Sequence, residues 1–324
     1  MASIDLAKYN LRTDLIIENN ELTHEEKSID NLIITTTKKN GNYITLSFED
    51  ITDSDNFNKV IATLNEILQD LLKLNNIKED DSCLIIGLGN RKSTPDSLGV
   101  KVLDDIDVTA HLFALKEVSP GMRKTYALTP GVMASTGIES SDIIKAVINK
   151  IKPDFVIAID ALASRAVERI NKTIQITDTG IHPGSGIGNN RLEISRKTIG
   201  IPIIAIGVPT VVLSSTIVAD TIDYLYKHIS YIKDNEDLHK LSFHKTNYKS
   251  KLKDKSLTNS EKENLLGLFG SLSEIEQRSL IDEVLTKTEL NYIVTPTEID
   301  FLIDKLSSLI AKSLNTTLHR QINS

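Results

Sequence analysis

Three short apolar runs in the middle of the chain constrain its fold more than any other feature. They are Cys83–Leu88, Phe155–Ile159 and Ile203–Val208, and none of them contains a charged residue. Segments with a helical spacing of apolar residues follow at 98–105, 138–151 and 211–229. Continuous apolar strands alternating with helices are typical of a parallel sheet that is covered on both faces. The sequence therefore predicts an α/β fold with a mostly parallel, twisted sheet and helices on both faces.

The segments on either side of this central region predict further elements. Residues 31–48 contain two β-branched runs separated by Lys-Lys-Asn-Gly, which predicts an N-terminal β-hairpin. Residues 56–75 have an apolar helical periodicity. The polar composition of 231–260 indicates a variable excursion, and the helical segments after it predict a C-terminal helical extension over 261–324.

Composition excludes several classes of protein. The chain has 324 residues, a formal net charge of −7 and one cysteine, Cys83. A single cysteine excludes an internal disulfide framework and a multi-cysteine metal site, and it favours a reducing compartment. The acidic balance argues against a protein whose main task is binding nucleic-acid phosphates directly.

One uncharged stretch, Thr198–Ala219, is about as long as a membrane span. Pro202 and Pro209 would both lie inside such a helix, where proline disrupts the hydrogen bonding. We therefore expect a buried strand, a turn at Pro209 and then a helix, and no membrane association. The charged amino terminus also lacks the apolar core of a secretory signal.

The loop after the first apolar run contains Asp96. In an open parallel sheet the ligand crevice lies beyond the carboxyl ends of the strands, so this loop is a candidate site. It is not a dinucleotide fingerprint, because Lys92 stands where the third glycine would be. From the residues alone, Asp96 is best explained as an N-cap of the helix that begins near Leu98.

Asp160 directly follows the second apolar run. A carboxylate at the end of a buried strand needs a partner or a function, which favours a functional role here. The structural alternative is an ion pair with Arg165.

The third candidate loop spans 178–191 and is rich in glycine. Asp178 begins an Asp-Thr-Gly triplet like that of pepsin-like proteases, but those enzymes are all-β and need two such triplets, whereas this chain has one. His182 could carry a proton or bind a metal, although a histidine before a proline is more often structural.

Two chemistries remain open for Asp96 and Asp160 on sequence grounds. A carboxylate pair can share one proton, so that one member activates water and the other protonates the leaving group. Alternatively, the two carboxylates and His182 could hold a divalent cation. A third possibility is a non-catalytic α/β module whose glycine-rich loops bind a small anionic ligand.

Several long blocks of the sequence resemble the germination proteases of spore-forming bacteria. These blocks are CLIIGLGN and STPDSLG within 83–99, PGVMASTGIESSDII at 130–144, PDFVIAIDALASR and its continuation at 153–191, and GIPIIAIGVPTVV at 200–212. The resemblance spans nearly the whole chain, from YNLRTDL at the start to VTPTEIDFLI near the end.

This resemblance implies a sequence-specific endopeptidase that starts the degradation of small acid-soluble spore proteins during germination. It implies an inactive precursor, a homotetramer, a location in the cytoplasm of the forespore or spore core, and self-cleavage of a propeptide. The processing site would be the Asp14–Leu15 bond, which makes residues 1–14 the propeptide and 15–324 a single α/β peptidase domain. This site consists of an acidic residue and an apolar residue, with a glutamate a few positions later. The pattern is similar to the sites that the family cuts in its substrates.

The family is similar in fold to hydrogenase-maturation proteases, which carry acidic residues at the carboxyl edge of the sheet. By this analogy the catalytic pair is Asp96 and Asp160, with His182, Asp178 and Arg165 as supporting candidates. No cofactor is implied. The aspartic-type mechanism is favoured, and a metal held by Asp96, Asp160 and His182 stays as the alternative.

Overall fold

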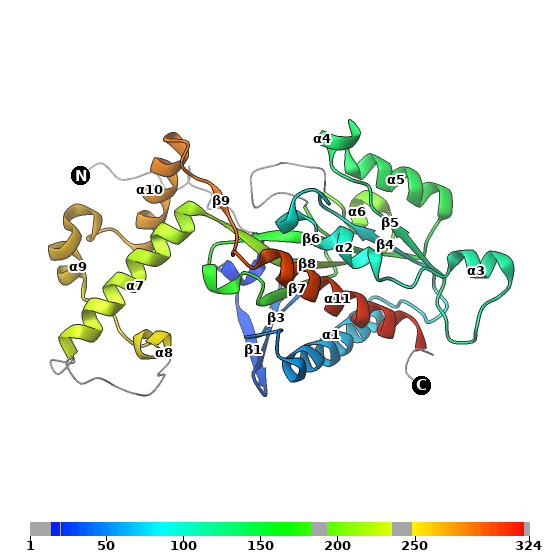
Figure 1. Ribbon diagram of the computed structural model, residues 1–324, viewed down its shortest axis with the longest axis horizontal. Coiled ribbons are helices and arrows are strands. Elements are labelled where there is room, and N and C mark those ends of the chain that lie inside the picture. The colour runs from blue at the N-terminus through cyan, green and yellow to red at the C-terminus, as the bar shows by residue number, and fades with distance from the viewer. Residues whose placement is uncertain (1–13, 20, 183–192, 235–247, 321–324) are drawn as a thin grey trace. The chain divides into compact units, whose positions relative to one another are not determined.

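The computed structural model describes residues 14–19, 21–182, 193–234 and 248–320, so residues 1–13 of the expected propeptide lie outside the described residues. The described chain divides into two compact units (Figure 1). One is helical and consists of Arg165–Val167 and Val212–Val294. The other contains most of the sheet and is formed by the remaining described residues. The sequence predicts one domain over 15–324, whereas in the structure residues 212–294 belong to a separate compact unit.

The strands are β1 (His24–Ile29), β2 (Leu32–Lys38), β3 (Asn42–Ser47), β4 (Cys83–Gly87), β5 (Thr125–Leu128), β6 (Phe155–Ser164), β7 (Thr173–Thr177), β8 (Ile203–Leu213) and β9 (Ile293–Val294). The α-helices are α1 (Ser54–Leu74), α2 (Leu98–Asp104), α3 (Ala110–Leu115), α4 (Met133–Thr136), α5 (Ser140–Ile151), α6 (Arg196–Ile199), α7 (Ser214–Asp234), α8 (Tyr248–Leu252), α9 (Asn259–Leu266), α10 (Glu274–Lys287) and α11 (Ile299–Leu318).

The α/β class is confirmed, but the sheet is mixed rather than mostly parallel. Its order is β1-β2-β3-β7-β8-β6-β4-β5, with β9 paired to β8. β4 is parallel to β5 and β6, whereas β1, β2, β3 and β7 form an antiparallel series that continues to β8. The apolar pattern could not reveal this, because antiparallel β7 is as fully buried as β4. Only a short connection without an α-helix separates β6 from β7, and parallel strands need longer crossovers.

Two strands are longer than the sequence predicts. β8 continues through Pro209 to Leu213, so the expected turn at Pro209 is wrong. Proline lacks an N–H donor, but the Pro209 carbonyl still accepts a hydrogen bond from the Asn171 N–H at 2.8 Å. β6 likewise runs past Ile159 to Ser164, so Asp160 lies within the strand.

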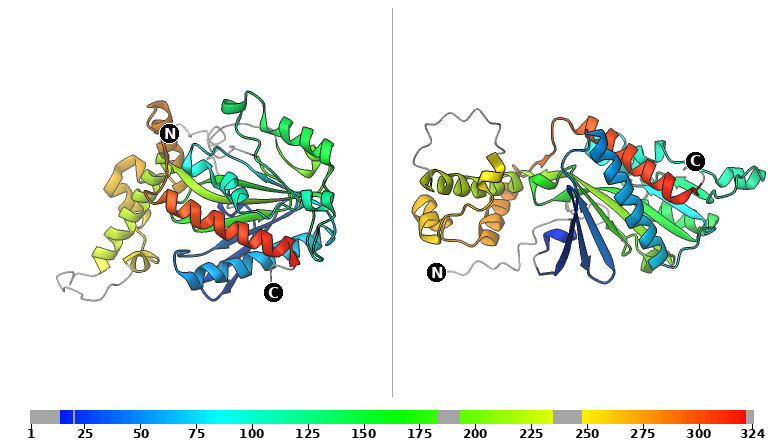
Figure 2. Two further views of the ribbon diagram at one scale, coloured as in Figure 1. Left: turned by 45° about the vertical axis from the view of Figure 1, so that its right-hand side comes forward. Right: turned by 90° about the horizontal axis from the view of Figure 1, so that it is seen from below.

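The two faces of the sheet pack into separate apolar cores. Alternation along β6 directs Ile157 and Ile159 to one face, where they join side chains of α1, α2 and α11. It directs Ala158 and Leu162 to the opposite face, where they join side chains of α5. We call these the α1/α11 face and the α5 face. Figure 2 shows α1 and α11 side by side on the first of them.

The C-terminal helices divide between the two units. α10 contacts α7 within the helical unit, whereas α11 contacts α1 and α2 in the sheet unit. The predicted extension over 261–324 is therefore split, because the apolar residues of α11, such as Ile303 and Leu314, are buried in the core of the α1/α11 face.

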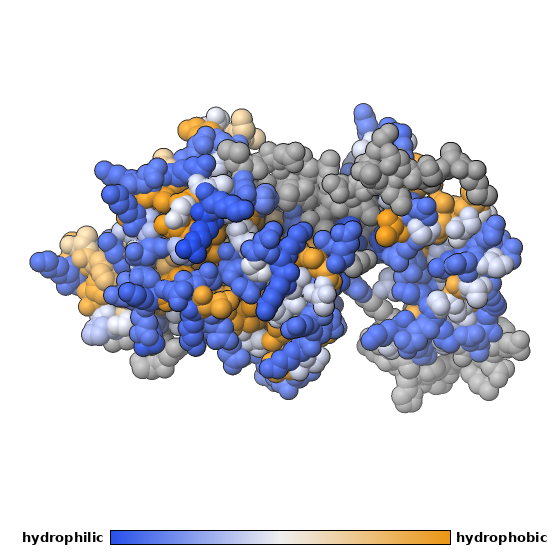
Figure 3. Space-filling view, turned by 180° about the vertical axis from the view of Figure 1, so that it is seen from behind, coloured by the Kyte–Doolittle hydropathy of each residue, from blue (hydrophilic) through white to orange (hydrophobic). Residues whose placement is uncertain are grey.

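The surface seen from behind in Figure 3 is covered mostly by hydrophilic residues. Hydrophobic residues on that face lie in small, separate groups between the hydrophilic ones. Scattered exposed apolar residues of this kind are normal on a folded protein.

His319 is a structural histidine and predicts acid sensitivity. It is 0% exposed; its Nδ1 accepts from the Arg123 N–H at 3.2 Å, and its Nε2 lies 3.2 Å from the Asp107 carbonyl. Burial lowers the pKa of His319 in the folded chain. Its contribution to stability is therefore complete above the unfolded pKa, about 6.5, and is lost as the pH falls below it.

We expect the melting temperature of the natural chain to decrease as the pH is lowered below about 6.5. In His319→Gln the melting temperature should depend less on pH. Thermal unfolding between pH 5 and pH 8 measures this, with the exposed His111→Gln as the control. Equal pH slopes in all three proteins would contradict the prediction.

Candidate active site

Asp96 lies where strand β4 ends. β4 stops at Gly87, which is in register with Ile159 of β6, and the Leu88 N–H donates to the Ile159 carbonyl at 2.8 Å. The chain then makes a short 3-10 turn, Thr94–Asp96, which contacts β6. The Asp96 carbonyl accepts from the Asn90 N–H at 2.9 Å, so the loop closes on itself and holds Asp96 at this edge.

Asp160 is the first residue of β6 beyond the register partner of Gly87. It is 4% exposed, and its Oδ1 accepts a hydrogen bond from the Ala161 N–H at 2.9 Å. Strand alternation puts its side chain on the α5 face, with Ala158 and Leu162. Asp96 and Asp160 thus lie at the same end of neighbouring parallel strands.

Glycines allow this close packing around Asp96. A Cβ at Gly99 would overlap the Ile159 carbonyl, and one at Gly87 would overlap the Gly99 carbonyl, so α2 sits directly against the strand ends. Gly89 has a φ of 106°, and a Cβ there would overlap the Asp96 carbonyl and lie 3.2 Å from its Oδ1. The N-cap of α2 is Ser97 rather than the expected Asp96, and the Ser97 side chain makes no capping hydrogen bond.

Asp178 has a structural role at the other end of the sheet's strands, away from Asp96 and Asp160. β7 is antiparallel to β8, so the end of β7 lies where β8 begins. The Asp178 carboxylate accepts from the Asn42 N–H and from Asn42 Nδ2, both at 2.7 Å, and so holds the turn between β2 and β3.

The remaining supporting candidates, His182 and Arg165, lie in the segments that follow β7 and β6. His182 Nε2 lies 3.7 Å from Glu193 Oε2, and its side chain is 59% exposed. Arg165 follows the end of β6 and belongs to the helical unit. Within the described residues, no group of three or more His, Cys, Asp or Glu side chains is placed to hold a metal ion.

The bond predicted to be processed lies near the end of β6 that contains Asp160. The Asp14 N–H donates to the Ala163 carbonyl at 3.2 Å, and the Ala163 N–H donates to Asp14 Oδ2 at 2.9 Å. Leu15 is 1% exposed and packs in the same apolar core as Leu162. The Asp14–Leu15 bond is therefore on the α5 face, at the same end of β6 as Asp160.

Two further groups hold this segment. Gln175 Nε2 donates to the Asp14 carbonyl at 3.0 Å, and Gln175 Oε1 accepts from the Ile16 N–H at 2.7 Å. Four residues after Asp14, Glu18 accepts from the Ser164 hydroxyl at 2.6 Å and lies 3.8 Å from the Arg169 guanidinium. The chain from Asp14 to Glu18 is thus bound at both ends.

A cavity opens beside Asp14 on the α5 face. It has a volume of about 290 Å³, and small residues such as Gly207 and Ala205 leave room in its floor. Its lining residues are Asp14, Lys39, Tyr43, Leu162, Gln175, Thr177, Gly180, Ile181, His182, Ala205 and Gly207. The cavity thus adjoins Asp14 and Gln175, two of the residues that hold the Asp14–Leu15 bond.

Residues 12–324 match the family described as germination protease. The chain belongs to this family. It is 44% identical to the germination protease of Bacillus pumilus, over 99% of this chain and 96% of that protein. Identity to the Bacillus subtilis germination protease is 43% over 99% and 97%, and to that of Bacillus velezensis 49% over 88% and 80%.

Membership of the germination protease family supports a peptidase with a role in germination, which acts on protein substrates. It favours this function over the non-catalytic binding module. Among the described residues, no helix combines the length and apolar character that crossing a membrane would require.

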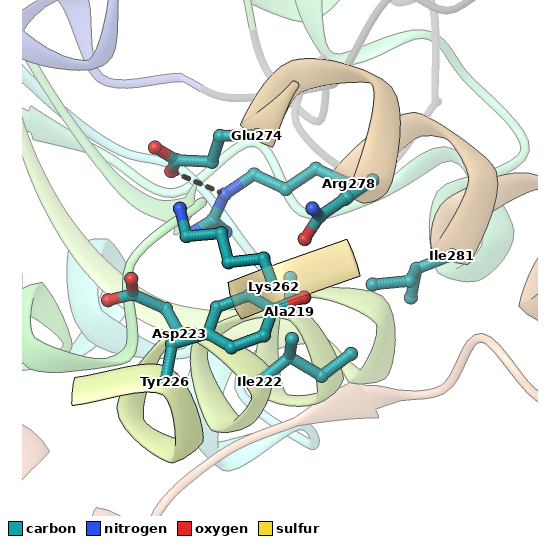
Figure 4. A pocket seen from close by; sticks show the side chains of 9 residues that line it. Ala219, Ile222, Asp223, Tyr226, Lys262, Glu274, Arg278 and Ile281 are labelled. Carbon is teal, nitrogen blue, oxygen red and sulfur yellow. Dashed lines mark hydrogen bonds and ion pairs between the residues drawn. The ribbon is translucent and has the colours of Figure 1, made fainter. Parts of the chain in front are cut away.

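The helical unit of this germination protease family member contains a small pocket (Figure 4). Its volume is about 40 Å³, which suits a water molecule rather than a peptide. Arg278 bonds Glu274 there at 3.1 Å and Asp220 at 2.9 Å. The Asp220 contact links α10 to α7, whereas Glu274 and Arg278 both belong to α10. The pocket is too small for a peptide and is therefore not the candidate active site.

Sequence reasoning did not single out Gln175, Ser164 or Arg169. The available signal for Gln175 was a single amide inside the run TIQIT, where its neighbours on the strand are β-branched. Because a buried amide needs hydrogen-bond partners, such a residue marks a place where another polar backbone is bound.

Proposed function

We propose that this chain is a sequence-specific endopeptidase, made as a zymogen, that cuts its own Asp14–Leu15 bond. The mature enzyme, residues 15–324, then starts the degradation of small acid-soluble spore proteins. Asp96 and Asp160 form the catalytic carboxylate pair.

One observation carries this proposal. Asp14 is held to Ala163, three residues after Asp160, by its backbone N–H and its carboxylate, and Gln175 holds the Asp14 carbonyl and the Ile16 N–H. Leu15 has extended backbone angles, φ −92° and ψ 120°, which resemble the conformation in which peptidases commonly bind substrates. These contacts support the proposal, because the segment is bound in an extended form at the end of the strand that carries Asp160.

The carboxylate pair accounts for hydrolysis with a balanced exchange of protons. One ionised carboxylate accepts a proton from water while the water oxygen bonds to the Asp14 carbonyl carbon. The protonated partner then donates its proton to the Leu15 nitrogen as the carbon–nitrogen bond breaks. The products are a carboxyl group on Asp14 and a new amino terminus on Leu15.

The expected setting follows from the family. Substrates are small acid-soluble proteins, the enzyme acts as a homotetramer in the cytoplasm of the forespore or spore core, and it neither binds DNA nor enters a membrane. The net charge of −7 supports the absence of direct DNA binding, because an acidic surface is repelled by phosphates.

Self-cleavage is tested with the purified full-length chain. We expect mass spectrometry to detect loss of residues 1–14 and cleavage of an added acid-soluble spore protein. Because the segment is bound within its own chain, the rate constant should not change on tenfold dilution. A chain that stays full length and leaves the spore protein intact would contradict the proposal.

The metal-dependent alternative is tested in the same assay with a strong chelator. Under the proposed carboxylate mechanism, cleavage continues unchanged in the chelator. Loss of cleavage that is restored by one divalent cation would instead select a metal site that includes Asp96 and Asp160.

A further inference from the structure

We propose that the side-chain amide of Gln175 holds the bond to be cut and stabilises the oxyanion that forms on the Asp14 carbonyl oxygen. This inference rests on the proposed self-cleavage and adds a residue that acts on the carbonyl rather than on the water. The same amide would hold the corresponding bond of protein substrates.

The geometry consists of two hydrogen bonds from one side chain. Gln175 Nε2 donates to the Asp14 oxygen at 3.0 Å, and Gln175 Oε1 accepts from the Ile16 N–H at 2.7 Å. The amide therefore spans the Asp14–Leu15 bond as a neighbouring strand would, and Leu15 directs its side chain into the core. No other orientation of the amide satisfies both partners, since a carbonyl only accepts and an N–H only donates.

The fold makes room for this contact. Strand alternation sends Ile174 and Ile176 into the core of the α1/α11 face, so Gln175 projects from the α5 face. Its partner on β8 is Gly207, which has no side chain to compete for the space. Gln175 is 7% exposed, so its hydrogen bonds are largely shielded from water.

Shielded donors of this kind act most strongly on developing charge. When water bonds to the Asp14 carbon, the carbonyl electrons move to its oxygen, and the Gln175 N–H lies on that oxygen. Removing one oxyanion donor typically lowers a rate constant by about 100-fold to 1,000-fold. The bond to Ile16, in contrast, is the same before and during the reaction and serves positioning.

The test compares Gln175→Ala and Gln175→Glu with Gln277→Ala. Glutamate keeps the size of the side chain and removes the N–H donor. Gln277 is an equally buried control in the helical unit, also 7% exposed, with Nε2 bonded to the Leu272 carbonyl at 2.9 Å. We expect self-cleavage to slow about 100-fold in both Gln175 variants, and Gln277→Ala to keep the natural rate.

A second reaction separates catalysis from binding. Mature enzyme is given a peptide with the sequence of residues 9–20, and kcat and KM are measured. An oxyanion donor predicts that most of the loss in the Gln175 variants is in kcat, whereas a purely structural role would change both through loss of folded protein. Melting temperatures report the folded fraction.

A third measurement does not need activity. In an Asp160→Asn background, hydrogen exchange of the Ile16 amide should accelerate in Gln175→Ala and not in Gln277→Ala. If the natural chain cleaves itself and the folded Gln175 variants cleave equally fast, this inference fails and the proposed function stands. If the natural chain cleaves neither itself nor the peptide, both fail. If the Ile16 amide exchanges at the same rate with and without the Gln175 side chain, the positioning role of Gln175 is wrong in either case.

Discussion

Asp160→Asn should leave the chain folded and reduce self-cleavage at Asp14–Leu15 by about 1,000-fold or more, and Asp96→Asn should do the same. Asparagine has nearly the shape of aspartate but neither takes a proton from water nor donates one to a leaving amine. Asp160 is almost fully buried, and it lies three residues before Ala163, which binds Asp14. The measurement is the time course of loss of residues 1–14, followed by mass spectrometry, with circular dichroism as the check on folding.

Asp154→Asn is the matched control for this experiment. Asp154 immediately precedes the first residue of β6. Its carboxylate accepts from the Ser82 N–H at 2.7 Å and from the Ser82 hydroxyl at 2.6 Å. These hydrogen bonds lower the pKa of Asp154. Its replacement therefore shows what the loss of a hydrogen-bonded carboxylate next to β6 does to self-cleavage. If folded Asp160→Asn cleaves itself as fast as Asp154→Asn, the catalytic assignment is wrong.

Gly89→Ala is expected to lower the rate of self-cleavage by about 100-fold without changing any acidic residue. A methyl group at Gly89 would overlap the Asp96 carbonyl, and the loop can relieve this only by moving Asp96. A small displacement of a catalytic group costs about this much in rate. The measurement is again the rate of loss of residues 1–14.

The control separates displacement of Asp96 from backbone strain. Gly137 also has a positive φ, 72°, but a Cβ there meets nothing within 4 Å. Both substitutions should carry a backbone-angle cost of roughly 1 kcal/mol, because alanine disfavours these angles. Only Gly89→Ala should lose cleavage, and equal rates in the two variants would contradict the role given to the Asp96 loop.

Sequence predicted the positions of the central strands but not the direction of all their neighbours. The apolar runs found β4, β6 and β8 because these strands are buried on both faces. Burial carries no information on direction, so β7 and the antiparallel series beyond it could not be distinguished from parallel strands. The extension of β8 through Pro209 depends on a carbonyl acceptor that only the folded chain reveals.

The residues of the candidate site also differ in whether the sequence alone could identify them. Asp160 was recognisable as a charge at the edge of an apolar strand, and Asp96 came from the family resemblance, because its own loop suggested a helix cap. Gln175 is far from Asp14 in sequence, and the two meet only because β7 and β6 flank β8 in the sheet. Contacts that depend on strand order cannot be derived from local spacing.

The burial of Leu15 determines the fate of the new amino terminus once the first bond is cut. The backbone nitrogen of Leu15 is a neutral amide within the apolar core of the α5 face, but hydrolysis would turn it into a charged ammonium group. An ammonium group loses far more hydration free energy on burial than an amide does. Cleavage would therefore lower the stability of the buried position of residue 15, and rejoining of the two ends would require this charge to be neutralised and desolvated again.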